Sequence, residues 1–100
     1  MEKLGFEKTA HFIERQQQRG ITDPLVMMAI ACGERFYQGS ERVYFLGRKH
    51  LERAQRKLGA VLSEREARRA EGTVVVVGVD NSLITTYRNP SYIRHLRRCA

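Results

Sequence analysis

The segment Thr73-Val-Val-Val-Val-Gly-Val-Asp-Asn-Ser-Leu-Ile-Thr-Thr-Tyr-Arg88 decides the fold class of this chain. Residues 73–79 are almost all valine, a β-branched residue that is enriched in strands. An unbroken apolar run of this length is typical of a central strand covered on both faces. The pair Asp80-Asn81 tolerates a positive φ and predicts a hairpin turn into a second strand over residues 82–88.

A two-residue turn at Asp80-Asn81 predicts which side chains share a face of the sheet, because side chains alternate along a strand. One face would carry Thr73, Val75, Val77, Val79, Ser82, Ile84, Thr86 and Arg88. The other face would carry Val74, Val76, Gly78, Leu83, Thr85 and Tyr87.

Two helices are expected near the N-terminus. Thr9 is a good N-cap residue for a helix that ends near Arg19, where Gly20 stops it. A second helix begins at Thr22 or Asp23, carries proline in its first turn and ends before residue 33.

The apolar pattern changes after Gly33 from a helical period to short aromatic-rich runs. Residues 34–38 and 42–46 are therefore predicted to form a hairpin around Gly39-Ser40. Asn89-Pro90 ends the last strand, and residues 92–98 are predicted to form a short basic helix.

Residues 48–72 lie between the two predicted strand pairs and predict an inserted basic helical hairpin. Leu51, Ala54 and Leu58 form a narrow apolar stripe, and Ser63-Glu-Arg-Glu66 is a capping box. Residues 1–100 are thus expected to form one α+β domain. Two N-terminal helices would pack on a four-stranded antiparallel sheet, with the basic hairpin outside the core and a short C-terminal helix.

The net charge of +7 lies entirely in the second half of the chain. Residues 1–47 sum to zero, whereas residues 48–72 carry eight basic and four acidic side chains and residues 73–100 carry four and one. Such an excess favours a polyanionic partner, which can be a nucleic acid, an anionic membrane surface or an acidic protein. The predicted nucleic-acid contacts are Arg48, Lys49, Arg53, Arg56, Lys57, Arg68, Arg69, Arg94, Arg97 and Arg98.

Cys32 and Cys99 are the only cysteines, and they form no metal-binding pattern with the three widely spaced histidines. Neither a metal nor another cofactor is predicted. The longest apolar run, residues 74–77, is far shorter than the ~18 residues that a membrane span needs. Since no signal-peptide pattern is recognisable at the N-terminus, the expected location is the reducing cytoplasm, with free thiols and no membrane association.

His11, Arg15 and Arg19 stand four residues apart, so they line one face of the first predicted helix. Two guanidinium groups beside an imidazole suit a phosphate ligand. Two other interpretations stay open: the stripe is a solvated helix face, or an arginine pairs with a carboxylate such as Glu34 and joins helix to sheet.

The run His11-Phe-Ile-Glu-Arg-Gln-Gln-Gln-Arg-Gly-Ile21 resembles the His-Ala-x-x-Arg-x-x-x-Arg-Gly-Ile opening of the bacterial family catalogued as domain of unknown function 4258. The strand Ile84-Thr-Thr-Tyr-Arg88 fits the Ile-Thr-x-Tyr strand that closes that family. In this chain Phe12 replaces the usual alanine, and residues 48–72 are longer than the usual strand connection. The family is similar to BrnT-type toxins and to the RelE-like fold of small metal-independent ribonucleases.

The resemblance implies an RNA-cleaving toxin domain, with an acidic antitoxin as a second partner. Metal-free cleavage needs a base, cations around the phosphate and an acid for the leaving oxygen. The candidate catalytic residues are His11 as base, Arg15, Arg19 and Arg88 as phosphate ligands, and Tyr87 as acid, with His50 as the alternative acid. The competing hypotheses are a non-catalytic nucleic-acid-binding module and a protein-interaction module on the same fold.

Overall fold

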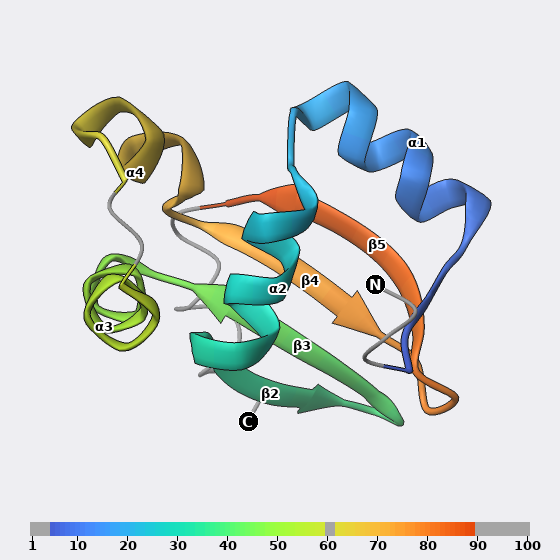
Figure 1. Cartoon of the computed structure of the whole chain (residues 1–100). Helices are drawn as coiled ribbons and strands as arrows, with labels where there is room; N and C mark the ends of the chain where they lie inside the picture. Colours follow the sequence, from blue (N-terminus) through green and yellow to red (C-terminus); the bar gives the residue numbers. More distant parts are fainter. Residues whose placement is uncertain (1–4, 60–61, 90–100) are drawn as a thin grey trace.

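A five-stranded sheet with helices over one face forms the centre of the molecule (Figure 1). The computed structural model describes residues 5–59 and 62–89. The strand order is β1-β5-β4-β3-β2. The strand bounds are Glu7–Lys8 for β1, Glu34–Gln38 for β2, Glu41–Leu46 for β3, Thr73–Val77 for β4 and Ser82–Arg88 for β5.

The prediction of four antiparallel strands is confirmed for β2 to β5, and it lacked β1. This strand pairs parallel to β5, so the sheet is mixed. Glu7 N–H donates to the carbonyl of Asn81 at 3.2 Å, and Thr9 N–H donates to the carbonyl of Leu83 at 3.1 Å. A strand of two residues has no alternating pattern that a sequence could reveal.

The hairpin between β4 and β5 differs from the predicted two-residue turn. Asn81 N–H donates to the carbonyl of Gly78 at 3.0 Å, and Gly78 N–H donates to the carbonyl of Ser82 at 2.8 Å, so the loop has three residues. Asn81 has a φ of 66°, as expected for the last position of such a loop. The register shifts between Val76 and Val77.

This irregularity changes the faces of two residues. Leu83 joins Val75 and Val77 under the helices, whereas Ile84 joins Val74 and Val76 on the opposite face. The predicted faces of Leu83 and Ile84 were therefore wrong. On the far side of this register shift, Thr73 pairs with Arg88 and Val74 pairs with Tyr87, so the predicted faces of these residues are confirmed.

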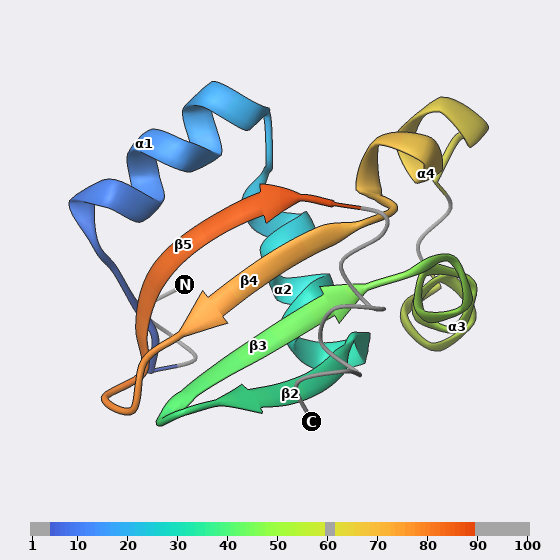
Figure 2. The same cartoon turned by 180° about the vertical axis from the view of Figure 1, so that it is seen from behind.

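The two N-terminal helices, α1 (Ala10–Arg19) and α2 (Asp23–Cys32), lie on the same face of the sheet (Figures 1 and 2). Thr9 caps α1 as predicted, since its Oγ1 accepts a hydrogen bond from Phe12 N–H at 3.1 Å. The same hydroxyl donates to the carbonyl of Leu83 at 2.9 Å. One side chain thus starts α1 and attaches it to β5.

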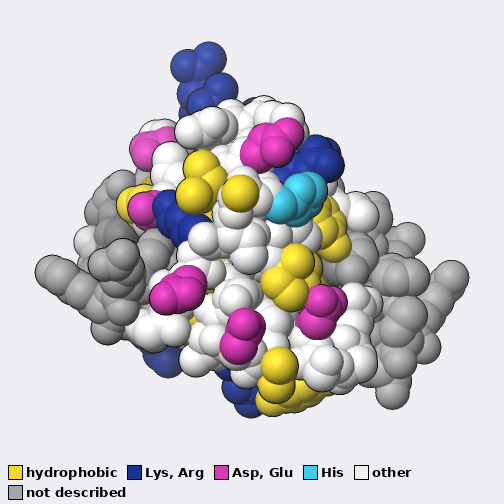
Figure 3. Space-filling view, turned by 90° about the vertical axis from the view of Figure 1, so that its right-hand side faces the viewer, with side chains coloured by type: hydrophobic (Ala, Val, Ile, Leu, Met, Phe, Trp, Pro, Cys, Tyr) yellow, Lys and Arg dark blue, Asp and Glu magenta, His cyan; other side chains and the backbone are white. Residues whose placement is uncertain are grey.

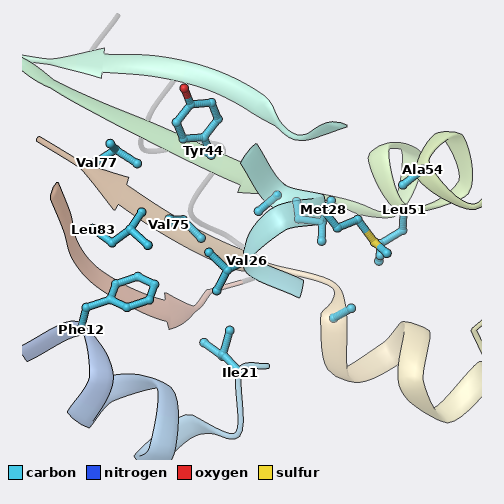
Figure 4. Packing of buried hydrophobic residues seen from close by; sticks show 13 residues of the cluster. Phe12, Ile21, Val26, Met28, Tyr44, Leu51, Ala54, Val75, Val77 and Leu83 are labelled. Atoms are coloured by element: carbon cyan, nitrogen blue, oxygen red, sulfur yellow. The ribbon is translucent and has the colours of Figure 1, made fainter. Parts of the chain in front are cut away.

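The inserted segment forms the two predicted helices, α3 (Arg48–Leu58) and α4 (Glu64–Ala70). The capping box of α4 is confirmed by two reciprocal hydrogen bonds of 3.1 Å between Ser63 and Glu66. The expectation that this segment lies outside the core was wrong, because Leu51, Ala54 and Ala70 are buried in the main cluster. Figure 4 shows Leu51 and Ala54 beside Met28 of α2. The narrow apolar stripe therefore packs α3 against α2.

The second face of the sheet carries its own apolar cluster of Val43, Phe45, Val74 and Val76, all buried. Both faces of β4 are thus covered, which confirms the prediction of a central strand. Among the described residues, no helix lies on this second face (Figure 2). The predicted helix over residues 92–98 lies outside the described residues.

A polar contact fixes the turn between α1 and α2. The buried Gln16 donates from Nε2 to the carbonyl of Ile21 at 3.0 Å and to Asp23 Oδ1 at 2.8 Å. Lys8 of β1 also contacts Asp23, with its Nζ at 2.7 Å from Oδ1. The hydrogen bond from Gln16, and then that from Lys8, lowers the pKa of Asp23 below its ordinary value. These contacts determine where the end of α1 lies over the sheet.

Candidate nucleic-acid interface

The exposed face of α1 carries His11 and Arg15 in contact with each other. Arg15 Nε donates to His11 Nε2 at 3.4 Å, and Arg15 Nη1 donates to Gln18 Oε1 at 3.0 Å. Gln18 in turn donates to Glu14 Oε1 at 3.2 Å. The described partners of Arg15 thus lie on its own helix, and they hold its guanidinium along the helix surface.

Figure 3 shows the side of the molecule that lies to the right in Figure 1, where α1 is found. Acidic side chains are interspersed there with basic ones and a histidine, so this side presents no continuous basic surface. The region around α1 is therefore less suited to a polyanion than the sequence stripe suggested.

Arg19 lies at the other end of α1 and belongs to a different environment. Eight residues of helix separate it from His11, which corresponds to about 12 Å along the axis. Arg19 lines a hollow with Arg69 of α4 and Arg88 of β5. The stripe predicted from the sequence is therefore divided into a His11–Arg15 contact and a separate cluster at the end of the helix.

We call this hollow the arginine pocket. It has a volume of about 290 Å³ and is lined by Arg19, Gly20, Ile21, Leu25, Arg69 and Arg88. Among the described residues that line it, none is acidic. Ile21 is buried and Leu25 is half-buried, so the pocket has an apolar wall next to its three guanidinium groups.

Arg88 is held in place by the end of α4. Its Nη2 donates to the carbonyl of Arg68 at 2.8 Å, and its Nε donates to the carbonyl of Glu71 at 3.3 Å. These carbonyls belong to the last turn of a helix, where no intrahelical donor reaches them. Arg88 thus caps α4 and brings a positive charge to the pocket. Figures 1 and 2 show that the end of β5 lies close to the end of α4.

A second hollow, the α4 hollow, adjoins the pocket and shares Arg69 and Arg88 with it. Its other lining residues are Glu64, Arg65 and Arg68, and its volume is about 450 Å³. Glu64 Oε1 lies 3.3 Å from Arg68 Nη2 in an exposed ion pair. The two hollows together bring five arginines into one region of the surface.

The five predicted catalytic residues do not assemble at one site. Tyr87 lies on the second face of the sheet, against the cluster around Val74, whereas α1 covers the first face. The alternative acid, His50, lies in α3 at the opposite side of the molecule from α1 (Figure 1). Its Nδ1 accepts a hydrogen bond from Gly47 N–H at 3.0 Å, at the start of α3. The structure thus contradicts both assignments of an acid beside His11.

The predicted nucleic-acid contacts are also divided. Arg68 and Arg69 lie at the hollows just described, whereas five basic residues lie on α3: Arg48, Lys49, Arg53, Arg56 and Lys57. The groove between α3 and α4 is lined by Glu52, Glu64 and Glu71 as well as by arginines, and Arg48 Nε lies 3.5 Å from Glu71 Oε1. Arg94, Arg97 and Arg98 lie outside the described residues.

Two features of this region were not predicted from the sequence. They are Arg65 in the α4 hollow and the apolar wall of the arginine pocket. Arg65 lies one helical turn from Arg68 and Arg69, and this spacing was a usable signal. No local pattern predicts that Ile21 and Leu25 lie near Arg69, because this closeness depends on how distant elements pack.

No family model matches this chain, and no curated protein or solved structure matches it. Within residues 5–59 and 62–89, each helix is too short or too polar to span a bilayer. No group of three His, Cys, Asp or Glu side chains among those residues comes together as a set of metal ligands.

Proposed function

We propose that this domain binds RNA, and that the arginine pocket holds a phosphate of the RNA backbone. One observation carries the proposal: Arg19, Arg69 and Arg88 come from three distant segments to line one hollow, and no acidic side chain is among its described lining residues. Like charges gathered in this way repel each other, and a bound anion relieves that repulsion. A planar guanidinium also matches the oxygens of a phosphate in a bidentate manner.

The distribution of charge supports a polyanion as the partner. The chain carries +7 overall, and two of the three pocket arginines belong to its basic second half. The resemblance to RelE-like ribonucleases independently implies RNA. An acidic protein such as an antitoxin is the competing partner, and it would be attracted by the same charges.

A titration of the whole chain with a labelled single-stranded RNA tests this proposal. Affinity measured by fluorescence anisotropy should fall as salt rises, with a log–log slope of roughly −2 if three phosphate contacts release counterions. Absence of binding at low salt, or an affinity that salt does not change, would contradict it.

Metal-independent cleavage at His11 is a second candidate function, and the contact between His11 and Arg15 favours it. Nε2 of the exposed His11 lies 3.4 Å from Arg15 Nε, and once this long contact opens it could take the proton of a 2′-hydroxyl while water gives a proton to the leaving 5′-oxygen. Arg15 would then lie beside the phosphate on which negative charge develops. This site is separate from the arginine pocket, which would only position the RNA.

Replacing His11 by alanine should lower RNA cleavage about 100-fold or more, the usual contribution of a general base. RNA affinity and melting temperature should stay unchanged, because the His11 side chain is exposed. The measurement is cleavage of a labelled RNA with and without EDTA. Tyr87→Phe is the matched control, and its cleavage rate should equal that of the original chain. Cleavage that survives in His11→Ala, or that EDTA abolishes, would rule out this mechanism.

A further inference from the structure

We infer that the arginine pocket binds the terminal phosphate of an RNA chain, a phosphomonoester, in preference to an internal phosphodiester. This inference rests on the proposed function and specifies its ligand. The arguments concern the charge of the pocket, its shape and the hollow that adjoins it.

The charge of the pocket matches a dianion better than a monoanion. A phosphomonoester carries about −1.5 to −2 at neutral pH, whereas an internal phosphodiester carries a single charge. Within residues 5–59 and 62–89, neither Arg19 nor Arg69 takes part in an ion pair, so no described carboxylate competes with a ligand for these two guanidinium groups. Arg88 uses Nε and Nη2 on α4 carbonyls, which leaves Nη1 for a ligand. Three arginines and no acidic side chain line the pocket, which leaves a surplus of positive charge that one phosphodiester would not neutralise.

The shape of the pocket favours an end of the chain. Four elements surround it: the end of α1, the start of α2, α4 and the end of β5. An internal phosphodiester requires the chain to leave on two sides, whereas a terminal phosphate requires one exit. The buried Ile21 and the half-buried Leu25 close one wall with apolar surface, against which the sugar or base of the terminal nucleotide can pack.

The α4 hollow offers an exit from the pocket along α4, because the two hollows share Arg69 and Arg88. It is more open than the arginine pocket, and it continues from Arg69 and Arg88. Four arginines and Glu64 line it, and Glu64 pairs with Arg68, so the hollow stays positive and can attract the internal phosphates that follow a terminal one. A terminal phosphate in the pocket would thus be followed by internal phosphates along α4.

Four ligands test this inference on the whole chain: one RNA sequence with a 5′-phosphate, with a 3′-phosphate or with neither, and inorganic phosphate. We expect one phosphorylated RNA to bind about tenfold more tightly than the unphosphorylated one, as for the loss of a charged hydrogen bond. The phosphorylated RNA that binds more tightly shows whether the 5′ or the 3′ terminus enters the arginine pocket. Inorganic phosphate should compete with the phosphorylated RNA for the pocket. The preference should also grow from pH 5 to pH 7.5, because the second pKa of a phosphomonoester is near 6.

Arg69→Gln should abolish the preference, while the matched variant Arg53→Gln on α3 should keep it. Equal affinity for all three RNAs would overturn the inference and leave RNA binding intact. A preference that survives in Arg69→Gln would place the terminal phosphate elsewhere and also overturn it. Absence of binding to all three RNAs would overturn both the inference and the proposed function.

Discussion

The double variant Arg19→Glu/Arg69→Glu should bind RNA at least about 100-fold more weakly than the original chain, since each lost hydrogen bond to a charged group costs about 1.5–3 kcal/mol. Both arginines line the pocket that we propose as the phosphate site, and the new carboxylates would repel the ligand. The log–log slope of affinity against salt should also become shallower by roughly 0.7, as expected when the contact with one phosphate is lost.

The double variant Arg56→Glu/Lys57→Glu is the matched control. It changes the net charge by the same amount, on exposed residues of α3 that do not line the pocket. We expect it to weaken binding severalfold at most, through the long-range field alone. Melting temperatures should be similar in both variants, because all four side chains are exposed. Equal losses of affinity would show that total charge, and not the pocket, carries RNA binding.

Replacing Gly33 by alanine should destabilise the fold by about 3 kcal/mol or more, a cost at the upper end for overpacking. Gly33 follows α2 directly and precedes β2. A Cβ at this position would lie 2.4 Å from the carbonyl oxygen of Ala29 and 2.7 Å from that of Phe45. Both atoms belong to the backbone of packed elements, so α2 would have to move away from β3. Equilibrium unfolding in urea measures the loss.

Gly20→Ala is the control, because it is the same substitution at a glycine where an added Cβ meets no neighbouring atom. Gly20 also ends a helix, but it has a φ of 64° and open space around the position of a Cβ. Its substitution should cost about 1–2 kcal/mol, the penalty for an L-residue in the left-handed region. If Gly33→Ala lowers the free energy of unfolding by no more than Gly20→Ala does, then α2 can move away from β3 at little energetic cost.

The helix boundaries could be predicted because short-range contacts determine them. Thr9 accepts from an N–H three residues later, and the capping box joins Ser63 to Glu66 over the same interval. Gly20 and Gly59 end their helices in the left-handed conformation. The contact between His11 and Arg15, one helical turn apart, was predictable for the same reason.

The sheet could be predicted only where its strands are long. The run of valines identified β4 as a central strand, because an apolar run without alternation needs cover on both faces. The two residues of β1 carry no such pattern, and their pairing depends on Thr9 and on the loop at Asn81. The exchanged faces of Leu83 and Ile84 follow from a register shift that the sequence does not encode in any local pattern.

The amino-acid sequence by itself determined the positions of the helices, the central strand and the excess of positive charge in the second half. Only the tertiary structure decided which cations meet. Arg19, Arg69 and Arg88 are separated by 50 and 19 residues, and they converge because α1 packs on β5 and Arg88 caps α4. The same packing places Tyr87 on the opposite face of the sheet from α1. Local sequence patterns act over a few residues, whereas a site of this kind is assembled by contacts between elements that are distant in the chain.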